Sequence, residues 1–149
     1  MQNDPRQKAG KLKPVVRARE IQADQQLSRL VEIRQRKTEL VIQLRKYQKD
    51  YVDGVELLNQ ERSSAARSRL LALEGAVDHS KSIWYQTLRA VQEVESRERV
   101  QMQEVLAAER NLKSVEKLLG KHLESLRTLD RQKDQKTMDE LAIRRVSRG

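Results

Sequence analysis

The stretch that decides the fold runs from Leu70 to Leu129 and reads LLALEGAVDHSKSIWYQTLRAVQEVESRERVQMQEVLAAERNLKSVEKLLGKHLESLRTL. Alternating steps of three and four residues select 18 positions in it, of which 13 are apolar. These positions are Leu70, Leu73, Val77, Ser80, Trp84, Thr87, Val91, Val94, Glu98, Gln101, Val105, Ala108, Leu112, Val115, Leu119, His122, Leu126 and Leu129. Such a repeat over more than about eight heptads predicts a long helix with one apolar seam, as in a coiled coil.

Two further tracks with the same spacing precede it and predict a first long helix. One track is Ala23, Leu27, Leu30, Arg34, Lys37, Val41, Leu44, Gln48, Tyr51, Val55 and Leu58. The other is Leu30, Ile33, Leu40, Leu44, Tyr47 and Tyr51. Together they form an apolar stripe that is wider than one coiled-coil seam, which suits a helix that touches more than one partner.

Composition favours helices over a thick globular core. The 149 residues are 37% hydrophobic and 36% charged, where an ordinary domain has about 45–50% apolar and about 25% charged residues. The only prolines are Pro5 and Pro14, and no alternating β-branched run predicts a strand. The chain has no cysteine, which excludes disulfides and cysteine-ligated zinc.

We therefore predict an all-α fold, a long two-helix antiparallel coiled-coil hairpin with a short helical or irregular tip. We expect a single coiled-coil domain over residues 1–149, with breaks at Gly54, Ser63, Gly75 and Asp78–Ser80 in the tip. Its predicted parts are a flexible basic arm (1–14), a first long helix (15–52), a tip region (53–82) and a second long helix (83–145).

Two registers are possible for such a hairpin. A simple turn at Ser63-Ser64 would set residue i opposite about 128 − i, and the end of the apolar track would face the polar N-terminus. A separate tip would set residue i opposite about 148 − i, so that Leu40 would meet Ala108. The second register buries more apolar surface, and we expect it for that reason.

Charge is distributed unevenly along the chain, whose net charge is +9. Residues 1–49 carry 13 basic and 5 acidic groups, residues 50–110 carry 8 and 11, and residues 111–149 carry 10 and 6. The two termini meet at one end of a hairpin, so we expect a basic end and a mildly acidic tip with different partners.

Catalytic and metal-binding patterns are missing from the sequence. The two histidines, His79 and His122, are more than forty residues apart, and His122 falls on the apolar track, where we expect a polar seam residue. We therefore expect no enzymatic activity, no cofactor, no metal and no small-molecule substrate.

The closing residues 129–145 read LDRQKDQKTMDELAIRR. This stretch resembles the C-terminus of the flagellar export protein FliJ family, whose second helix ends in a DQKxMDExAxR-like segment. The length, the two-helix plan, the basic balance and the pair Tyr47-x-x-x-Tyr51 also agree, so the similarity covers essentially the whole chain.

The resemblance implies a fold similar to the coiled-coil part of the rotary ATPase γ subunit. Members of that family insert their terminal coiled-coil end into the central hole of the hexameric export ATPase FliI and promote assembly of its ring. They also touch the export gate FlhA and escort export chaperones. The implied function is that of the central stalk and general chaperone component of the flagellar type III export apparatus.

The resemblance also implies two contact sites. The family's gate contact uses small and apolar residues just after the tip break; the local match is Leu73-Glu74-Gly75-Ala76-Val77, and Leu70 lies beside Arg69, where the family can place an aromatic residue. The implied gate contacts are Leu70, Leu73 and Ala76. The implied contacts with the ATPase ring are Arg17, Arg19, Lys133, Gln135, Lys136 and Met138.

Other interpretations stay open at this point. Leu73 and Ala76 also fit ordinary packing of the tip, and the basic residues of the ring contact also fit plain solubility. The nearest rival family is the stalk protein of virulence-type type III secretion systems. A rival of another class is a basic coiled coil associated with nucleic acid, but no helix-turn-helix, bZIP or RNP pattern accompanies the charge.

We expect a cytoplasmic protein that reaches the inner-membrane export apparatus peripherally, through its partners. The first residues are polar and basic, with no secretory signal. The longest apolar runs, such as Leu40-Val41-Ile42, are far shorter than the ~20 residues of a membrane span.

Overall fold

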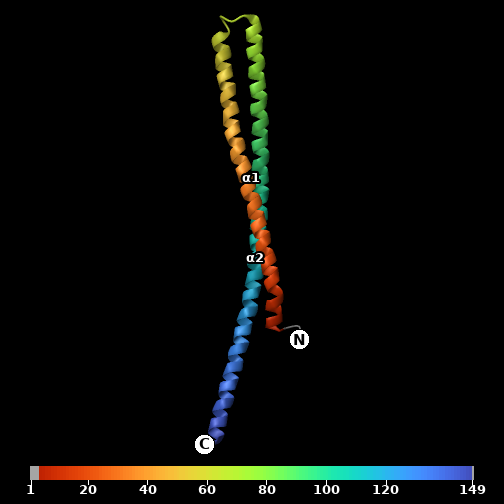
Figure 1. Cartoon of the computed structure of the whole chain (residues 1–149), viewed down its shortest axis with the longest axis vertical. Helices are drawn as coiled ribbons and strands as arrows, with labels where there is room; N and C mark the ends of the chain where they lie inside the picture. Colours follow the sequence, from red (N-terminus) through yellow and green to blue (C-terminus); the bar gives the residue numbers. More distant parts are fainter. Residues whose placement is uncertain (1–3, 149) are drawn as a thin grey trace. The chain divides into compact units, whose positions relative to one another are not determined.

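The protein folds into two long helices. The computed structural model describes residues 4–148, in which α1 spans Pro5–Glu61 and α2 spans Arg67–Arg148 (Figure 1). They pack against each other as an antiparallel hairpin, and the described residues contain no strand. This confirms the predicted all-α hairpin. Within residues 4–148, neither helix contains a segment long and apolar enough to cross a bilayer.

Contacts divide the chain into two units. The turn unit comprises residues 27–104, and the terminal unit comprises the described parts of 1–26 and 105–149.

The apolar seam of the turn unit follows the track predicted on the second helix. Leu40, Val91 and Val94 form its buried core, and four half-buried apolar residues pack on that core. These four are Ile33, Val41, Leu44 and Ala90. Every track position from Leu70 to Leu126 is buried or half-buried, in both units, whereas Leu129 is exposed. The three–four spacing therefore identified the packed face of α2 correctly up to that residue.

A short turn at residues 62–66 joins the helices. The carbonyl of Glu61 accepts hydrogen bonds from the backbone N–H groups of Ser64 (3.2 Å) and Ala65 (2.9 Å), which ends α1. The carbonyl of Ala66 accepts from Arg69 and Leu70, which begins α2. Backbone groups left unpaired at two helix ends are thus satisfied within a few residues.

The predicted tip region at 53–82 is wrong, since helix continues on both sides of the turn. Gly54 is a close-packing position rather than a break, because a Cβ atom there would lie 3.3 Å from Cγ2 of Val77. Gly75 lies within α2. A glycine inside a helix costs only about 1 kcal/mol, which packing along a long seam offsets.

The register expected from a separate tip is also wrong. The numbers of two facing residues should add up to about 128 for a simple turn and to about 148 for a separate tip. In the turn unit they add up to 135 for the contacting pair Lys37 and Glu98. They add up to 130 for Glu61 and Arg69. Leu40 packs with Val91 and Val94 rather than with Ala108. The register is therefore close to the simple turn that we did not favour.

Helix α1 begins at Pro5, in the terminal unit. The predicted flexible arm at 1–14 is therefore wrong for residues 5–14, and residues 1–3 lie outside the described residues. Asp4 caps the helix by accepting a hydrogen bond from the N–H of Arg6 at 3.0 Å, and a proline suits the first helical position. Ala9 is only 4% exposed. Packing of this segment offsets the hydrogen bond that Pro14 removes within the helix.

Most of the broad apolar stripe predicted on the first helix is buried or half-buried. Leu30, 2% exposed, and the rest of the second track form the seam. Leu27, Arg34 and Gln48 of the first track are exposed instead. The seam therefore uses only part of the apolar surface of α1.

A polar contact lies within the apolar seam of the turn unit. Glu98, which occupies a track position, pairs with the amino group of Lys37 at 3.2 Å and with Nε of Arg34 at 3.5 Å. Both Lys37 and Glu98 are partly buried. A partly buried ion pair at a seam position favours one helix register over the neighbouring registers, but removing the two charges from water costs free energy.

We predict that replacing this pair raises stability. The single change Glu98→Leu leaves Lys37 half-buried without its acceptor and lowers the free energy of unfolding by about 1 kcal/mol, whereas the double change K37L/E98L raises it by about 1 kcal/mol. Urea denaturation followed by circular dichroism measures both. A double variant less stable than the wild type would show that the pair stabilises the hairpin more than apolar packing would.

Candidate functional site

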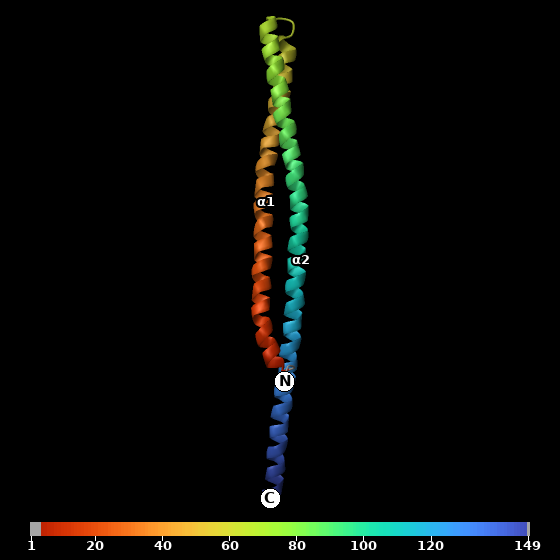
Figure 2. The same cartoon turned by 90° about the vertical axis from the view of Figure 1, so that its right-hand side faces the viewer.

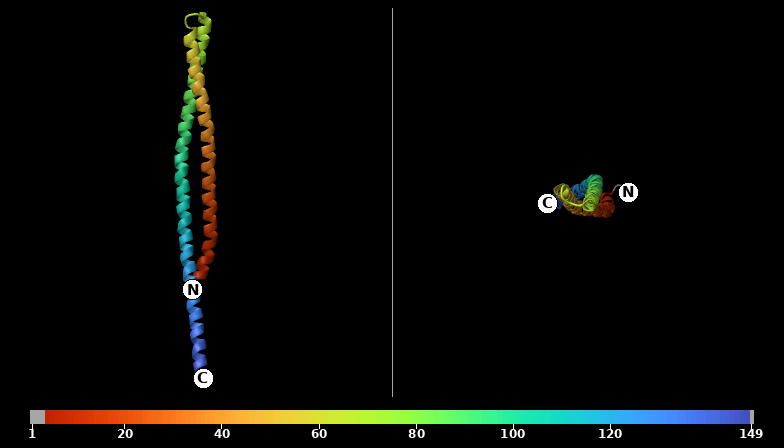
Figure 3. Two further views of the ribbon diagram at one scale, coloured as in Figure 1. Left: turned by 90° about the vertical axis from the view of Figure 1, so that its left-hand side faces the viewer. Right: turned by 90° about the horizontal axis from the view of Figure 1, so that it is seen from above.

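The end of α2 continues past the start of α1. In the terminal unit, Arg6 on the first turn of α1 pairs with Asp130 at 3.4 Å, and α2 runs on from there to Arg148 (Figure 2). The same extension is visible from the opposite side (Figure 3). We name residues 134–148 the C-terminal extension; all of them are exposed. At a rise of about 1.5 Å per residue it is about 22 Å long.

Apolar side chains on the C-terminal extension are unusually exposed. Met138 is 66% and Ile143 is 67% exposed, and Leu141 and Val146 are also open to solvent. Two shallow grooves lie among them, one beside Met138 and one beside Ile143. An apolar surface of this kind on a single helix is typical of an interaction site.

Four of the six residues expected at the ATPase ring lie on or beside the extension. The amide nitrogen of Gln135 donates a hydrogen bond to Asp139 at 3.1 Å, and Lys136 is exposed. Met138 lines one of the two grooves. Lys133 immediately precedes the extension.

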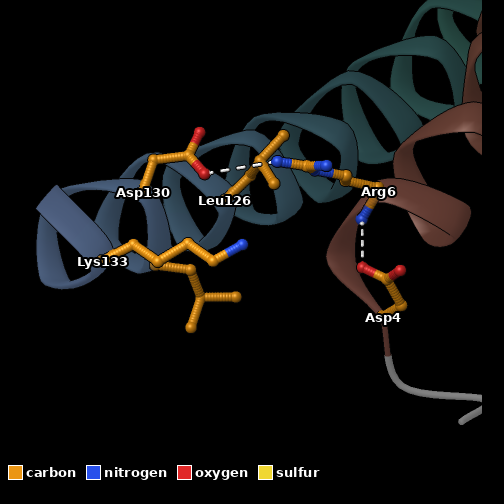
Figure 4. Close-up of a pocket in the computed structure, with 6 residues that line it drawn as sticks. Asp4, Arg6, Leu126, Asp130 and Lys133 are labelled. Carbon is orange, nitrogen blue, oxygen red and sulfur yellow. Dashed lines mark hydrogen bonds and ion pairs between the residues drawn. The ribbon is translucent and has the colours of Figure 1, made fainter. Parts of the chain in front are cut away.

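Lys133 points into a pocket where the start of α1 meets α2 (Figure 4). The pocket has a volume of about 310 Å³. It is lined by Asp4, Arg6, Leu126, Leu129, Asp130 and Lys133. Its two cations face two carboxylates, and Arg6 already binds both: its backbone N–H donates to Asp4 and its side chain to Asp130. The charges balance, so this pocket joins the two helices and has no excess charge for an ionic ligand.

The other two expected ring residues lie elsewhere in the terminal unit. Arg17 is exposed and Arg19 is half-buried. They follow Arg6 by 11 and 13 residues along α1, which is about 17–20 Å at the rise of a helix. The structure therefore does not bring Arg17 and Arg19 together with Lys133 and Met138, although both sets were expected at one site.

The residues expected at the export gate are only partly accessible. Leu70 and Leu73 are half-buried on the packed track of α2, and Ala76 is exposed. The most exposed apolar side chain nearby is Leu71, at 58%. Leu73 therefore belongs to the seam, which the sequence left open as an alternative.

Aromatic residues form a stack in the turn unit that the sequence indicated only in part. The rings of Tyr51 and Trp84, which both lie on the predicted apolar tracks, stack with centroids 5.4 Å apart. Tyr85 extends the stack at 5.3 Å from Trp84, and Lys81 lies over its ring. Tyr85 is exposed because it falls one position off the packed track. That offset is the sequence signal that could have identified it.

Arg69 has a structural partner in Glu61. Both Nε and Nη2 of Arg69 donate to the carboxylate of Glu61, the second at 2.8 Å. The hydrogen bond from Arg69, with its positive charge, holds the pKa of Glu61 below its ordinary value, and the same contact raises the pKa of Arg69. A bidentate pair across residues 62–66 ties the ends of the two helices together.

In residues 4–148, no three histidine, aspartate or glutamate side chains lie close enough together to hold a metal ion. The features with functional potential are exposed helical surfaces, which suit binding to other proteins.

Comparison with models of protein families gives a match over nearly the whole chain. Residues 7–149 match the family model described as Flagellar FliJ protein. No curated protein and no solved structure matches the chain significantly.

We predict that the Glu61–Arg69 pair makes hairpin stability depend on pH. Because the folded pKa of Glu61 is lowered, its contribution is present above the unfolded value of about 4.5 and is lost as pH falls through the folded value. Glu61→Gln should lower the melting temperature at pH 7 and have a smaller effect at pH 3. Thermal melts by circular dichroism test this, with E74Q as the control on an exposed carboxylate of α2. An equal loss at both pH values would contradict it.

Proposed function

Since this chain belongs to the flagellar FliJ protein family, its role lies in flagellar protein export, and we propose that it is the central stalk and general chaperone component of the export ATPase. In this proposal it inserts into the hexameric ATPase FliI and promotes assembly of the ring. It also contacts the export gate FlhA and escorts export chaperones. It is not an enzyme and needs no cofactor; it works in the cytoplasm and reaches the inner membrane through these partners.

The C-terminal extension carries the proposal. A segment that enters the hole of a ring must be slender, and it must offer side chains to the ring rather than to its own partner helix. Residues 134–148 meet both conditions, with Met138 and Ile143 exposed among basic residues. We assign the ring contact to Lys133, Gln135, Lys136 and Met138, with Arg17 and Arg19 as a second contact further along the terminal unit.

We assign the gate contact to the first turns of α2, at Leu70, Leu73 and Ala76. Because Leu70 and Leu73 are half-buried in the seam, Ala76 is the residue of the three that can touch the gate without opening the hairpin.

The flagellar role is better supported than its nearest rival. The family model that matches residues 7–149 is the flagellar one, which favours a flagellar stalk over the stalk of a virulence-type secretion system.

We predict that Met138→Asp lowers stimulation of ATP hydrolysis by the hexameric export ATPase about tenfold. A charge at this exposed apolar position would be buried without a partner in the ring. Val100→Asp is the matched control, because Val100 is a similarly exposed apolar residue of α2 in the turn unit. Reversing Arg17 and Arg19 to glutamate tests the second contact in the same assay.

The assay also tests the proposal as a whole. If the wild-type chain does not stimulate the ATPase but is retained on DNA in a salt-sensitive way, the stalk proposal fails in favour of a nucleic-acid-associated coiled coil. If M138D and V100D reduce stimulation equally, the ring contact is not at the extension.

We predict that Ala76→Asp weakens binding to the soluble domain of the export gate at least fivefold, with helicity and melting temperature unchanged because Ala76 is exposed. Ala107→Asp, at another exposed alanine of α2, is the control.

Leu73→Asp distinguishes packing in the seam from contact with the export gate. It places a charge in the seam and should lower the melting temperature by several degrees. If A76D binds the gate as well as the wild type does, the gate contact lies elsewhere.

A further inference from the structure

Helix α1 carries a further track of three–four spacing that lies outside the seam except at Val41. We name it the outer stripe: Leu27, Val31, Arg34, Thr38, Val41, Arg45, Gln48 and Val52. All of it lies in the turn unit. A second track at heptad spacing on one helix is the pattern of a helix that packs against two others.

The outer stripe is open to solvent. Leu27, Val31 and Val52 are each about half exposed, and Ile42, next to Val41, is 63% exposed. These residues lie outside the packed core of the turn unit, whereas Val41 contacts that core from the edge. Apolar side chains repeated along one face without cover indicate an interaction surface.

The middle of the stripe is hollowed into a groove of about 460 Å³. It is lined by Arg34, Lys37, Thr38, Val41, Ile42, Arg45 and Glu98. Val41 and Ile42 are its apolar lining residues, and three of the others are cations. A groove of this kind accepts the apolar side chains of a helix while charged residues flank them.

The charge of this groove is strongly one-sided. Three cations face a single carboxylate, and that carboxylate, Glu98, is already bound to Arg34 and Lys37. Arg45 has no ion-pair partner within residues 4–148. The groove therefore offers positive charge to a partner, and a second copy of the same groove would bring like charges together.

We propose that the outer stripe docks an acidic amphipathic helix of a partner protein, which packs along α1 as the third helix of a local coiled coil. Apolar residues of the partner insert beside Val31, Val41 and Ile42, and its flanking carboxylates pair with Arg34 and Arg45. This surface is separate from the ring contact and the gate contact proposed above, so it provides for a further partner.

The test uses the full-length chain and a fluorescein-labelled peptide of about three heptads. The peptide has leucine at positions a and d, glutamate at e and g, and alanine and glutamine elsewhere; a second peptide replaces glutamate by lysine. Fluorescence anisotropy at about 0.15 M salt should show the acidic peptide binding at least about tenfold more tightly than the lysine peptide.

Variants map the peptide to the groove. R34E/R45E should weaken the acidic peptide about tenfold or more, and Ile42→Ser several-fold. The matched control is R36E/R97E, which makes the same charge change at two exposed, ion-paired arginines of the turn unit outside the groove. It should change affinity less than about twofold. Because Arg45 has no ion pair to lose, R45E alone repeats the test if the double variant is less helical by circular dichroism.

Three results would overturn the proposal. Equal binding of the lysine peptide would remove the role of charge, and an equal loss in R36E/R97E would show unspecific attraction to a basic protein. Sedimentation showing a dimer of the chain that I42S dissociates would assign the stripe to a second copy of this chain.

Discussion

A short turn between two unbroken helices is the constraint on which the rest of the structure depends. Residues 62–66 reverse the chain without consuming a helical segment, and the bidentate Glu61–Arg69 pair ties the two helix ends. Within the turn unit this sets Lys37 against Glu98. Within the terminal unit α1 begins opposite Asp130, so that α2 continues alone.

Limited apolar surface then decides what each face can do. Two helices need one seam between them, and α1 has more apolar residues than that seam can bury. Leu30 and Leu40 enter the seam, whereas Leu27, Val31 and Ile42 remain outside it. The same holds for α2 beyond Leu129, where Met138 and Ile143 have no helix to cover them. In a protein without a deep core, partner proteins can bind to the apolar residues that remain outside the seam.

Burial also separates residues that the sequence places in one functional group. Leu70 and Leu73 repeat at seam spacing and contribute to the stability of the hairpin, whereas Ala76 lies between seam positions and is open. The ring residues divide as well: Met138 is on the extension, while Arg17 and Arg19 lie further along α1, where Arg19 is half-buried. Contacts with partners therefore depend on single exposed positions of a helix more than on continuous stretches of sequence.

The sequence by itself determined that the chain forms two long helices, which face of α2 is packed, and the family resemblance at residues 129–145. Each of these follows from residue types at short spacing: three–four repeats, the lack of proline after Pro14, and a local motif. Only the tertiary structure decided the register, the absence of a separate tip, the helical start at Pro5 and the exposure of the extension. Pairing of α1 with α2 depends on the sum of many contacts between residues distant in the chain. Against that sum, the local penalties of Gly54, Gly75 and Pro14 are small.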